Sequence, residues 1–205
     1  MSRSPAAPSG TGQQRTSNGL DQFFASIRDR ENLSLIDLAG ASQANISFIT
    51  EMGHRLYADD LLRSLDDAFG PAEGMLERQA DPQRIDEFVN QGFDFPECSV
   101  DGALVWDTLQ FLGPELLQAL VDRLYHIMRP DAHLLAIFHG NEKARTVPIY
   151  HYRINNARTV TIIPRGERAP AQVFNNRLIE KVFQQWGAIK FYVTRDNLRE
   201  VMVRR

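Results

Sequence analysis

The stretch Asp37-Leu-Ala-Gly-Ala-Ser42 decides the fold class, because it joins an apolar strand to a helix through a run of small residues. The strand is expected over 33–38. The helix is expected over 45–52, where apolar residues return at helical spacing and Gly53 stands at a typical helix end. A strand that ends in small residues and leads into a helix brings backbone N–H groups and an open crevice to a ligand. The stretch therefore predicts the ligand-binding edge of an open α/β sheet.

The chain continues with alternating strand and helix patterns. A second strand is expected over 55–58, a third over 93–95, a fourth over 102–106 and a fifth over 133–138. Helices are expected over 20–27, 61–69, 82–90 and 114–128, and Pro114 suits the first turn of the last of these. Strands joined through helices by short connections predict a parallel sheet with right-handed crossovers.

Beyond Gly140 the pattern becomes rich in β-structure. A hairpin is expected over 147–163 around Asn155-Asn156, followed by a helix over 174–186 and a closing antiparallel pair over 189–194 and 198–203. We therefore expect a three-layer α/β sandwich with a mostly parallel, seven-stranded sheet and an antiparallel C-terminal pair. Residues 1–19 are rich in Ser, Pro and Gly, so we expect a disordered tail before a domain over 20–205.

Composition limits the classes of protein that the chain can belong to. Its 205 residues suffice for one α/β domain, and the single Cys98 excludes a disulfide framework or a multi-cysteine zinc site. The five histidines show no metal-ligand spacing, so we expect no metal. Apolar runs are only of strand length and no secretory segment stands near the start, so we expect a cytoplasmic protein without a membrane span. Basic residues predominate over 150–205 but are scattered, which gives little support to a nucleic-acid partner.

Acidic residues stand at the ends of the first two strands. Asp37 closes the first strand, and Asp59 and Asp60 close the second about 20 residues later, where a carboxylate can accept both hydroxyls of a ribose. A dinucleotide site needs Gly-x-Gly-x-x-Gly, whereas this loop has only Gly40, so a nicotinamide cofactor is disfavoured. The acids suit a cofactor with a ribose and a cationic sulfonium or amine end.

Three stretches give the sequence a family resemblance. They are Asp37-Leu-Ala-Gly-Ala-Ser-Gln43, Val100-Asp-Gly-Ala-Leu-Val-Trp-Asp-Thr-Leu-Gln-Phe-Leu112, and 124–138 with Met128-Arg-Pro-Asp131 before an aliphatic strand. In order and spacing they resemble class I S-adenosylmethionine-dependent methyltransferases with a type 11-like domain, over residues 33–138. The resemblance implies a Rossmann-like fold, S-adenosylmethionine as cofactor, and methyl transfer to an acceptor that we expect to be a small molecule.

The resemblance also implies roles for individual residues. Asp37 would orient the methionine amino group, and Asp60, with Asp59 as the alternative, would bind the ribose. Asn90 or Gln91 would stand near the adenine. The remaining positions are the backbone amides of the loop and the mouth of the site at the end of the fourth strand: Ala39, Gly40, Ala41, Ser42, Trp106 and Asp107.

Departures from the family pattern leave a second hypothesis open. The three loop glycines of the family fall on Ala39, Ala41 and Gln43, and no catalytic base is evident. His139, after the fifth strand, and His151, in the hairpin, are the histidines placed to contact a substrate. A catalytically inactive relative that serves as an interaction module is therefore the alternative to an enzyme. Asp60 as a helix cap and Trp106 as a core residue are the structural alternatives at these two positions.

Overall fold

The computed structural model describes residues 12–194 and 196–205 of the chain. The strands are β1 (Gln13–Thr16), β2 (Ser34–Asp37), β3 (Arg55–Ala58), β4 (Val100–Trp106), β5 (Met128–His139), β6 (Val147–Asn156), β7 (Thr159–Arg168), β8 (Ala188–Val193) and β9 (Leu198–Arg204). The helices are α1 (Asn18–Ile27), α2 (Gln43–Glu51), α3 (Leu61–Phe69), α4 (Met75–Arg78), α5 (Pro82–Gly92), α6 (Pro114–Ile127) and α7 (Asn176–Val182), together with the 3-10 helix η1 (Thr108–Phe111). No helix in these ranges is long and apolar enough to cross a membrane.

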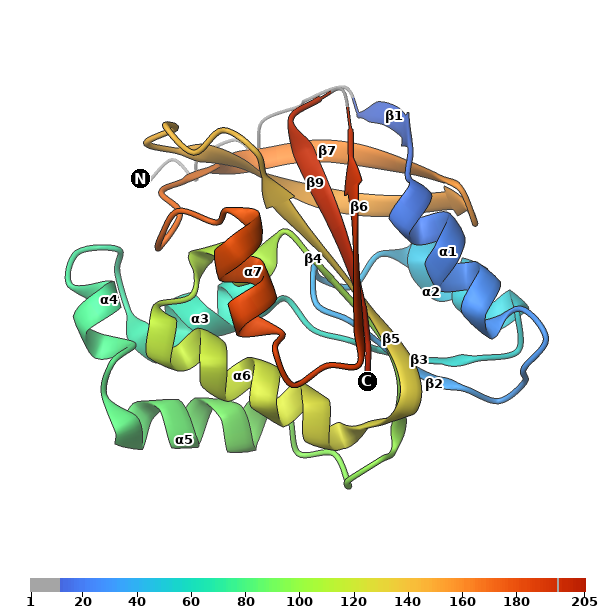
Figure 1. Ribbon diagram of the computed structural model, residues 1–205, viewed down its shortest axis with the longest axis horizontal. Helices are drawn as coiled ribbons and strands as arrows, with labels where there is room; N and C mark the ends of the chain where they lie inside the picture. The colour runs from blue at the N-terminus through green and yellow to red at the C-terminus, as the bar shows by residue number, and fades with distance from the viewer. Residues whose placement is uncertain (1–11, 195) are drawn as a thin grey trace, which may run out of the picture.

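The main sheet has the strand order β3-β2-β4-β5-β9-β8. Strands β3, β2, β4 and β5 run parallel, and β9 runs antiparallel to both β5 and β8. Helices α1 and α2 cover one face, and α3, α5, α6 and α7 cover the other (Figure 1). The predicted three-layer α/β sandwich with a mostly parallel sheet and an antiparallel C-terminal pair is confirmed.

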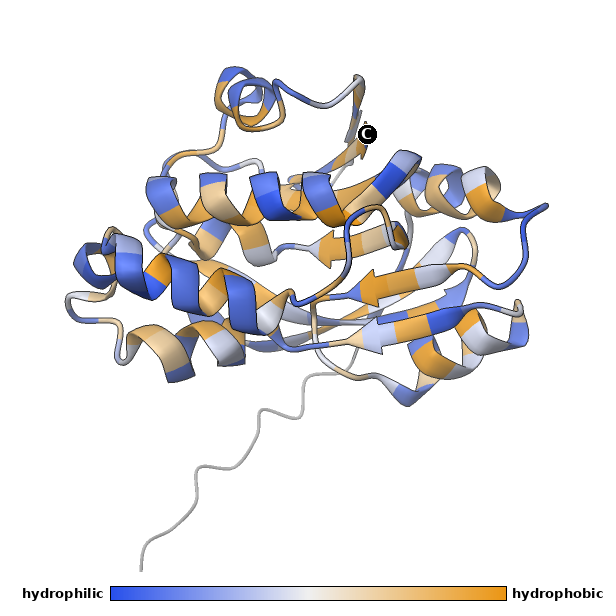
Figure 2. Cartoon of the chain, turned by 90° about the horizontal axis from the view of Figure 1, so that it is seen from below, coloured by the Kyte–Doolittle hydropathy of each residue, from blue (hydrophilic) through white to orange (hydrophobic). Residues whose placement is uncertain are grey.

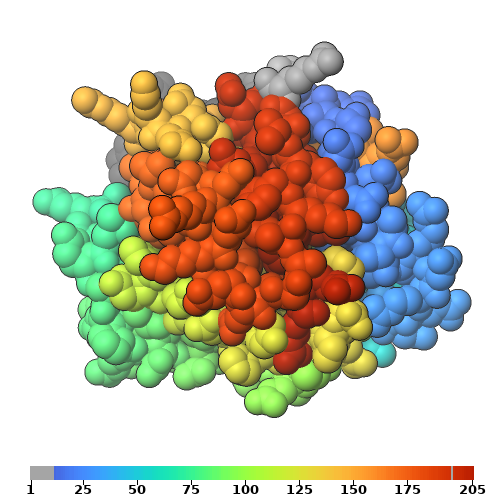
Figure 3. All heavy atoms as spheres, viewed as in Figure 1, coloured from blue at the N-terminus to red at the C-terminus, as the bar shows by residue number. Residues whose placement is uncertain are grey.

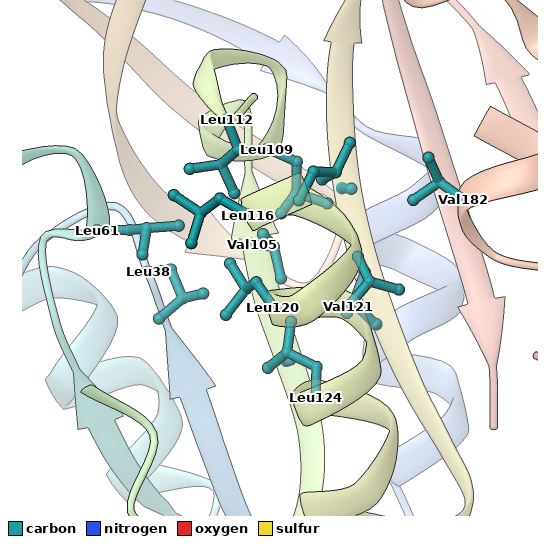
Figure 4. Close-up of a cluster of buried hydrophobic side chains, with 14 of the residues drawn as sticks. Leu38, Leu61, Val105, Leu109, Leu112, Leu116, Leu120, Val121, Leu124 and Val182 are labelled. Carbon is teal, nitrogen blue, oxygen red and sulfur yellow. The ribbon is translucent and has the colours of Figure 1, made fainter. Parts of the chain in front are cut away.

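Helix α6 shows how the core holds these layers together. Leu116, Leu120 and Leu124 lie on its inner side and point toward β4, where Val105 meets them (Figure 4). All four side chains are fully buried. Hydrophobic residues are concentrated on the central strands of the main sheet, and the helices turn hydrophobic sides toward them (Figure 2). The segment from α7 to the C-terminus occupies the middle of one face of the molecule (Figure 3).

The main sheet has six strands within the described residues, so the predicted count of seven is wrong. Residues 93–95 form no strand: α5 continues to Gly92, and Phe93 follows as its capping residue. The guanidinium of Arg123 on α6 donates to the carbonyl oxygen of Phe93 at 2.8 and 3.0 Å and to that of Phe95 at 3.0 Å. These carbonyls are bound by a side chain and do not pair with β3, which is left at the edge of the sheet.

The expected disordered tail does not extend over residues 12–19. Strand β1 pairs antiparallel with β7, and Ser17 caps α1 by accepting from the Leu20 N–H. The physical reason is a buried ion pair, because the Arg15 guanidinium lies 2.8 Å from the Glu200 carboxylate on β9. The same carboxylate accepts from the Gly19 N–H at 2.7 Å. Residues 1–11 of the expected tail lie outside the described residues.

A second sheet, of order β1-β7-β6, lies across the end of the main sheet (Figure 1). Strands β6 and β7, here called the hairpin, extend five residues beyond the predicted end, to Arg168. Four buried side chains of the hairpin pack in one apolar cluster with the sheet residues Leu104 and Trp106; they are Tyr152, Ile154, Val160 and Ile162. The hairpin therefore covers the edge at which β2, β3 and β4 end.

Candidate functional site

The parallel strands bring the predicted acidic residues to one edge of the sheet. Asp37, the last residue of β2, is paired in register with Ala58 on β3 and with Leu104 on β4. The side-chain period of two places Leu35 and Asp37 on the same face of the sheet as Leu104. Asp37 therefore points toward the layer formed by α2 and the hairpin.

The carboxylate of Asp37 has three donors from the chain itself. The Trp106 indole Nε1 donates at 2.7 Å, the Asn45 amide Nδ2 at 2.8 Å and the Ala39 N–H at 3.2 Å. The side chain is fully buried, and this burial raises its pKa although the three hydrogen bonds oppose the shift. The donors keep a buried carboxyl group from standing unpaired, which would be costly.

Trp106 takes up a backbone conformation that is rare outside glycine. Its φ is +55°, at a register shift between β4 and β5, and its side chain is fully buried. The indole stacks on the Tyr152 ring of the hairpin with centroids 4.4 Å apart and planes 13° apart. A non-glycine residue at positive φ costs on the order of 1–3 kcal/mol and persists where its surroundings hold it. Here the bond to Asp37 and the stack on Tyr152 supply that restraint.

The loop Ala39–Ser42 is closed against the end of β3. Gly40 has a φ of +95°, which favours glycine, and its N–H donates to the Asp59 carbonyl oxygen at 3.0 Å. Ala39 and Asp60 form a β-bridge. Gln43, predicted to fall on a family glycine, is exposed and donates to the Ser47 hydroxyl. It therefore stays on the outside of the helix, away from the loop.

Asp60 lies beside the loop and is already bound by an arginine. Arg165 of β7 donates to both carboxylate oxygens of Asp60, at 2.6 and 2.8 Å. Asp60 also caps α3 by accepting from the Arg63 N–H at 3.3 Å, as the structural alternative predicted. Partial burial acts to raise the pKa of Asp60, but the hydrogen bonds and charge of Arg165 hold it below its ordinary value. Asp60 is therefore a charged carboxylate with a charged partner.

The side chain of Asp59 points away from this arrangement. Its carboxylate accepts from the Ser64 hydroxyl at 3.1 Å. Together with Gln91 it lines a groove of about 1030 Å³ between α3 and α5. Asn90 is exposed on α5 and does not line that groove. Of the two acids at the end of β3, Asp60 is the one that the fold places next to Ala39 and Gly40.

A second polar group of residues lies where β4 and β5 end. Asp107 is fully buried, and burial raises its pKa to about 7. The buried Tyr152 hydroxyl is close enough to influence that pKa, yet neither side chain has a hydrogen-bond partner among the described residues. Gln110 connects this region to β5, donating to the Asp107 carbonyl oxygen at 3.1 Å and accepting from the His139 N–H at 3.2 Å. We call Asp107, Gln110, His139, Tyr150 and Tyr152 the Asp107 cluster.

The two predicted histidines lie at different ends of the site. His139 belongs to the Asp107 cluster, where its ring stacks on Tyr150 with centroids 6.0 Å apart. Burial lowers the pKa of His139, so the ring is neutral at neutral pH. His151 lies near Asp60 and Arg165, and burial together with the arginine charge lowers its pKa. A neutral imidazole can accept a proton, but neither ring contacts Asp37.

Sequence reasoning missed the side chains that bind the two acids. Asn45 donates to Asp37, donates to the Tyr152 carbonyl oxygen at 3.0 Å and accepts from the Ile154 N–H at 2.8 Å. Its signal in the sequence is a polar residue four positions before Ile49, on the buried face of α2. Arg165 has no comparable signal, because its partner Asp60 stands 105 residues earlier.

Comparison with solved structures identifies the fold. A S-adenosylmethionine-dependent methyltransferase from Mesorhizobium loti matches with a TM-score of 0.53 and 15% identity over 90% of this chain and 96% of that one. A SAM-dependent methyltransferase from Archaeoglobus fulgidus matches with a TM-score of 0.52 and 10% identity over 91% of each chain. Phosphoethanolamine N-methyltransferase 2 from Haemonchus contortus, in complex with S-adenosyl-L-methionine, matches with a TM-score of 0.50 and 10% identity over 90% of this chain and 52% of that one.

These likenesses show that the chain has the fold of S-adenosylmethionine-dependent methyltransferases. No family model matches the sequence, and no curated protein matches it.

The site suits S-adenosylmethionine in the kind of groups it offers. Asp37 accepts hydrogen bonds from an amide and an indole N–H. A methionine amino group would offer it N–H donors of the same kind. Asp60 accepts two parallel hydrogen bonds from the Arg165 guanidinium. The two hydroxyls of a ribose would offer it a similar pair of donors. The arrangement is also closed, because Asp37, Ala39 and Trp106 are buried and none of them lines the groove between α3 and α5. The groups therefore fit the cofactor in chemistry, and the hairpin covers them.

Proposed function

We propose that the chain is a S-adenosylmethionine-dependent methyltransferase that acts on a small-molecule acceptor. The observation that carries this proposal is the position of two carboxylates at neighbouring strand ends, Asp37 on β2 and Asp60 after β3, on either side of Ala39 and Gly40. The fold is that of the methyltransferases, and in such sheets ligands bind at the carboxyl ends of the strands.

Each carboxylate has a distinct role in this proposal. Asp37 would hold the amino group of the cofactor, and Asp60 would accept hydrogen bonds from its ribose hydroxyls. The cofactor supplies an electrophilic methyl group when bound. The remaining work of the protein is to align the acceptor with that methyl group and to exclude water, which is the main requirement of a displacement at carbon.

The Asp107 cluster is the proposed place of the acceptor. It lies at the ends of β4 and β5 beneath the hairpin, so a molecule bound there would be enclosed between two sheets. Groups buried in this way would be reached by a small molecule rather than by a macromolecule. Asp107 has a pKa of about 7 and could hold a proton given up by an acceptor N–H or O–H group.

A catalytically inactive interaction module is the second candidate function. The observation that favours it is the pairing of the same groups within the chain, since Asp37 and Asp60 each accept three internal hydrogen bonds. A loop with one glycine agrees with this reading. An interaction module could keep the methyltransferase fold without ever opening the site.

Ligand binding to the full chain separates the two candidates. A methyltransferase should bind S-adenosylhomocysteine in calorimetry and gain several degrees of melting temperature at about millimolar ligand, because a ligand of the native state stabilises it by mass action. NAD is the control ligand, since the loop lacks the dinucleotide fingerprint. Heat and a thermal shift with S-adenosylhomocysteine alone support the enzyme. Their absence in a folded sample supports the interaction module.

A further inference from the structure

The hairpin contacts both acids of the proposed cofactor site. Arg165 of β7 binds Asp60 directly, and Asn45 of α2 connects Asp37 to the backbone of β6. The Tyr152 ring stacks on Trp106, which is itself bound to Asp37. One element of about 20 residues, distant in sequence from β2 and β3, therefore closes the site through three separate contacts.

The contact between Arg165 and Asp60 is the strongest polar one of the three. It is bidentate and half-buried, with 21% of the Arg165 side chain and 24% of the Asp60 side chain exposed. Paired, charge-assisted hydrogen bonds of this kind are about twice as strong as neutral ones. The two carboxylate oxygens that Arg165 occupies are the ones that a ribose diol would need.

We infer that Arg165 is an internal competitor for Asp60, which holds the hairpin over the loop Ala39–Ser42 and has to leave before a ribose can bind. This inference rests on the proposed function, because it takes Asp60 as the ribose-binding carboxylate. The guanidinium lies against both carboxylate oxygens, so ribose hydroxyls that approach these oxygens from the same side have to displace it. The apparent affinity for the cofactor is then reduced by the fraction of molecules in which Asp60 is free.

The neighbouring Arg168 provides a matched control. It lies on the same strand and forms an ion pair of 2.8 Å with Asp66 of α3, the helix that Asp60 caps. Arg168→Met thus removes an arginine–aspartate contact between the same two elements but leaves Asp60 bound. If general loosening of the hairpin were sufficient, Arg168→Met and Arg165→Met would act alike.

The test measures binding of S-adenosylhomocysteine to full-length variants by calorimetry, with folding checked by circular dichroism. Arg165→Met should bind about tenfold more tightly than the wild type, while Arg168→Met should stay within about twofold. The gain should disappear in the Asp60→Asn, Arg165→Met double variant, because the carboxylate that Arg165 released is then lost. Arg165→Lys keeps the charge but loses the bidentate geometry, so it should show a smaller gain if Arg165→Met fails to fold.

Hydrogen exchange gives a readout that does not depend on the ligand. Amides over 147–168 should exchange faster in Arg165→Met than in Arg168→Met, because the contact that closes the site is gone. Equal affinity and equal exchange in Arg165→Met and the wild type would overturn the inference and leave the proposed function standing. An equal gain in Arg168→Met would also overturn it. Absence of binding in all variants would overturn the proposed function, and the competition with it.

Discussion

Asp107 links the chemistry of the site to the stability of the fold. Its carboxyl group is fully buried, and the pKa rises from 3.8 to about 7 in the folded chain. Between these two pKa values, Asp107 is protonated in the folded protein but ionised in the unfolded chain. Stability must fall as the pH rises from about 4 to about 7, where Asp107 becomes ionised in both states.

Replacing Asp107 by asparagine should remove this pH dependence. The variant should gain on the order of 4 kcal/mol in free energy of unfolding relative to the wild type between pH 4 and pH 8, since one pKa unit corresponds to about 1.4 kcal/mol. Urea unfolding at several pH values measures the difference, and Asp67→Asn, at an exposed position, is the control. A constant difference between Asp107→Asn and wild type across this range would contradict the prediction.

Some residues of the site can be recognised from their neighbours in the sequence, whereas others depend on contacts with distant parts of the chain. Asp37 and Asp60 could be found from the sequence, because Asp37 ends β2, Asp60 closely follows β3, and their separation along the chain follows from the fold. Trp106 was placed correctly at the end of β4, but its bond to Asp37 depends on a positive φ that no pattern indicates. Arg165 could not be found, because its role depends on how the hairpin docks onto residues about 100 positions away.

At the scale of elements, β1 depends on a charge pair as much as on the sheet. Arg15 is nearly buried, and Glu200, its partner on β9, is fully buried. Glu200 also accepts from the Gly19 N–H, so one carboxylate fixes both β1 and the start of α1. Losing one partner of such a pair leaves an uncompensated charge in the interior.

Arg15→Met should therefore destabilise the protein by roughly 3–5 kcal/mol, the usual cost of breaking a buried pair. Arg158→Met is the control, because Arg158 forms a longer, exposed pair of 3.5 Å with Asp21. It should change the free energy of unfolding by less than about 0.5 kcal/mol. Urea unfolding followed by circular dichroism measures both variants. Similar small effects at the two positions would show that Glu200 does not need Arg15.

Some elements were predicted with the correct first and last residues, because the residues at their ends mark where they start and stop. Helix α3 begins after its cap Asp60 and ends at Phe69, before Gly70, and β3 covers the predicted 55–58. The errors arose where a long-range contact decides the conformation. Residues 93–95 are apolar enough for a strand, but Arg123 binds their carbonyls. The segment around Arg15 lacks apolar residues, and a buried carboxylate from the other end of the chain orders it.

At the scale of the whole molecule, the central strands join two apolar clusters into one folding unit. Val105 packs in the cluster with α6 and α7, whereas its neighbours Leu104 and Trp106 pack in the cluster with α1, α2 and the hairpin. The two tryptophans of the chain lie on opposite sides, Trp186 in the first cluster and Trp106 in the second. Unfolding either cluster would expose one face of β4 and β5.

Single-tryptophan variants can test whether the two clusters unfold cooperatively. In Trp186→Phe the fluorescence reports on the hairpin side, and in Trp106→Phe it reports on the α7 side. For each variant, the urea midpoints from fluorescence and from circular dichroism should coincide, as expected for one cooperative unit. Trp106→Phe should also be less stable by about 1–3 kcal/mol, because it removes a donor of 2.7 Å from the buried Asp37, whereas the Trp186 Nε1 has no partner among the described residues. If the Trp106 signal changed at lower urea than the circular dichroism, the hairpin side would be a separate unit, and its opening would need no contribution from the rest of the fold.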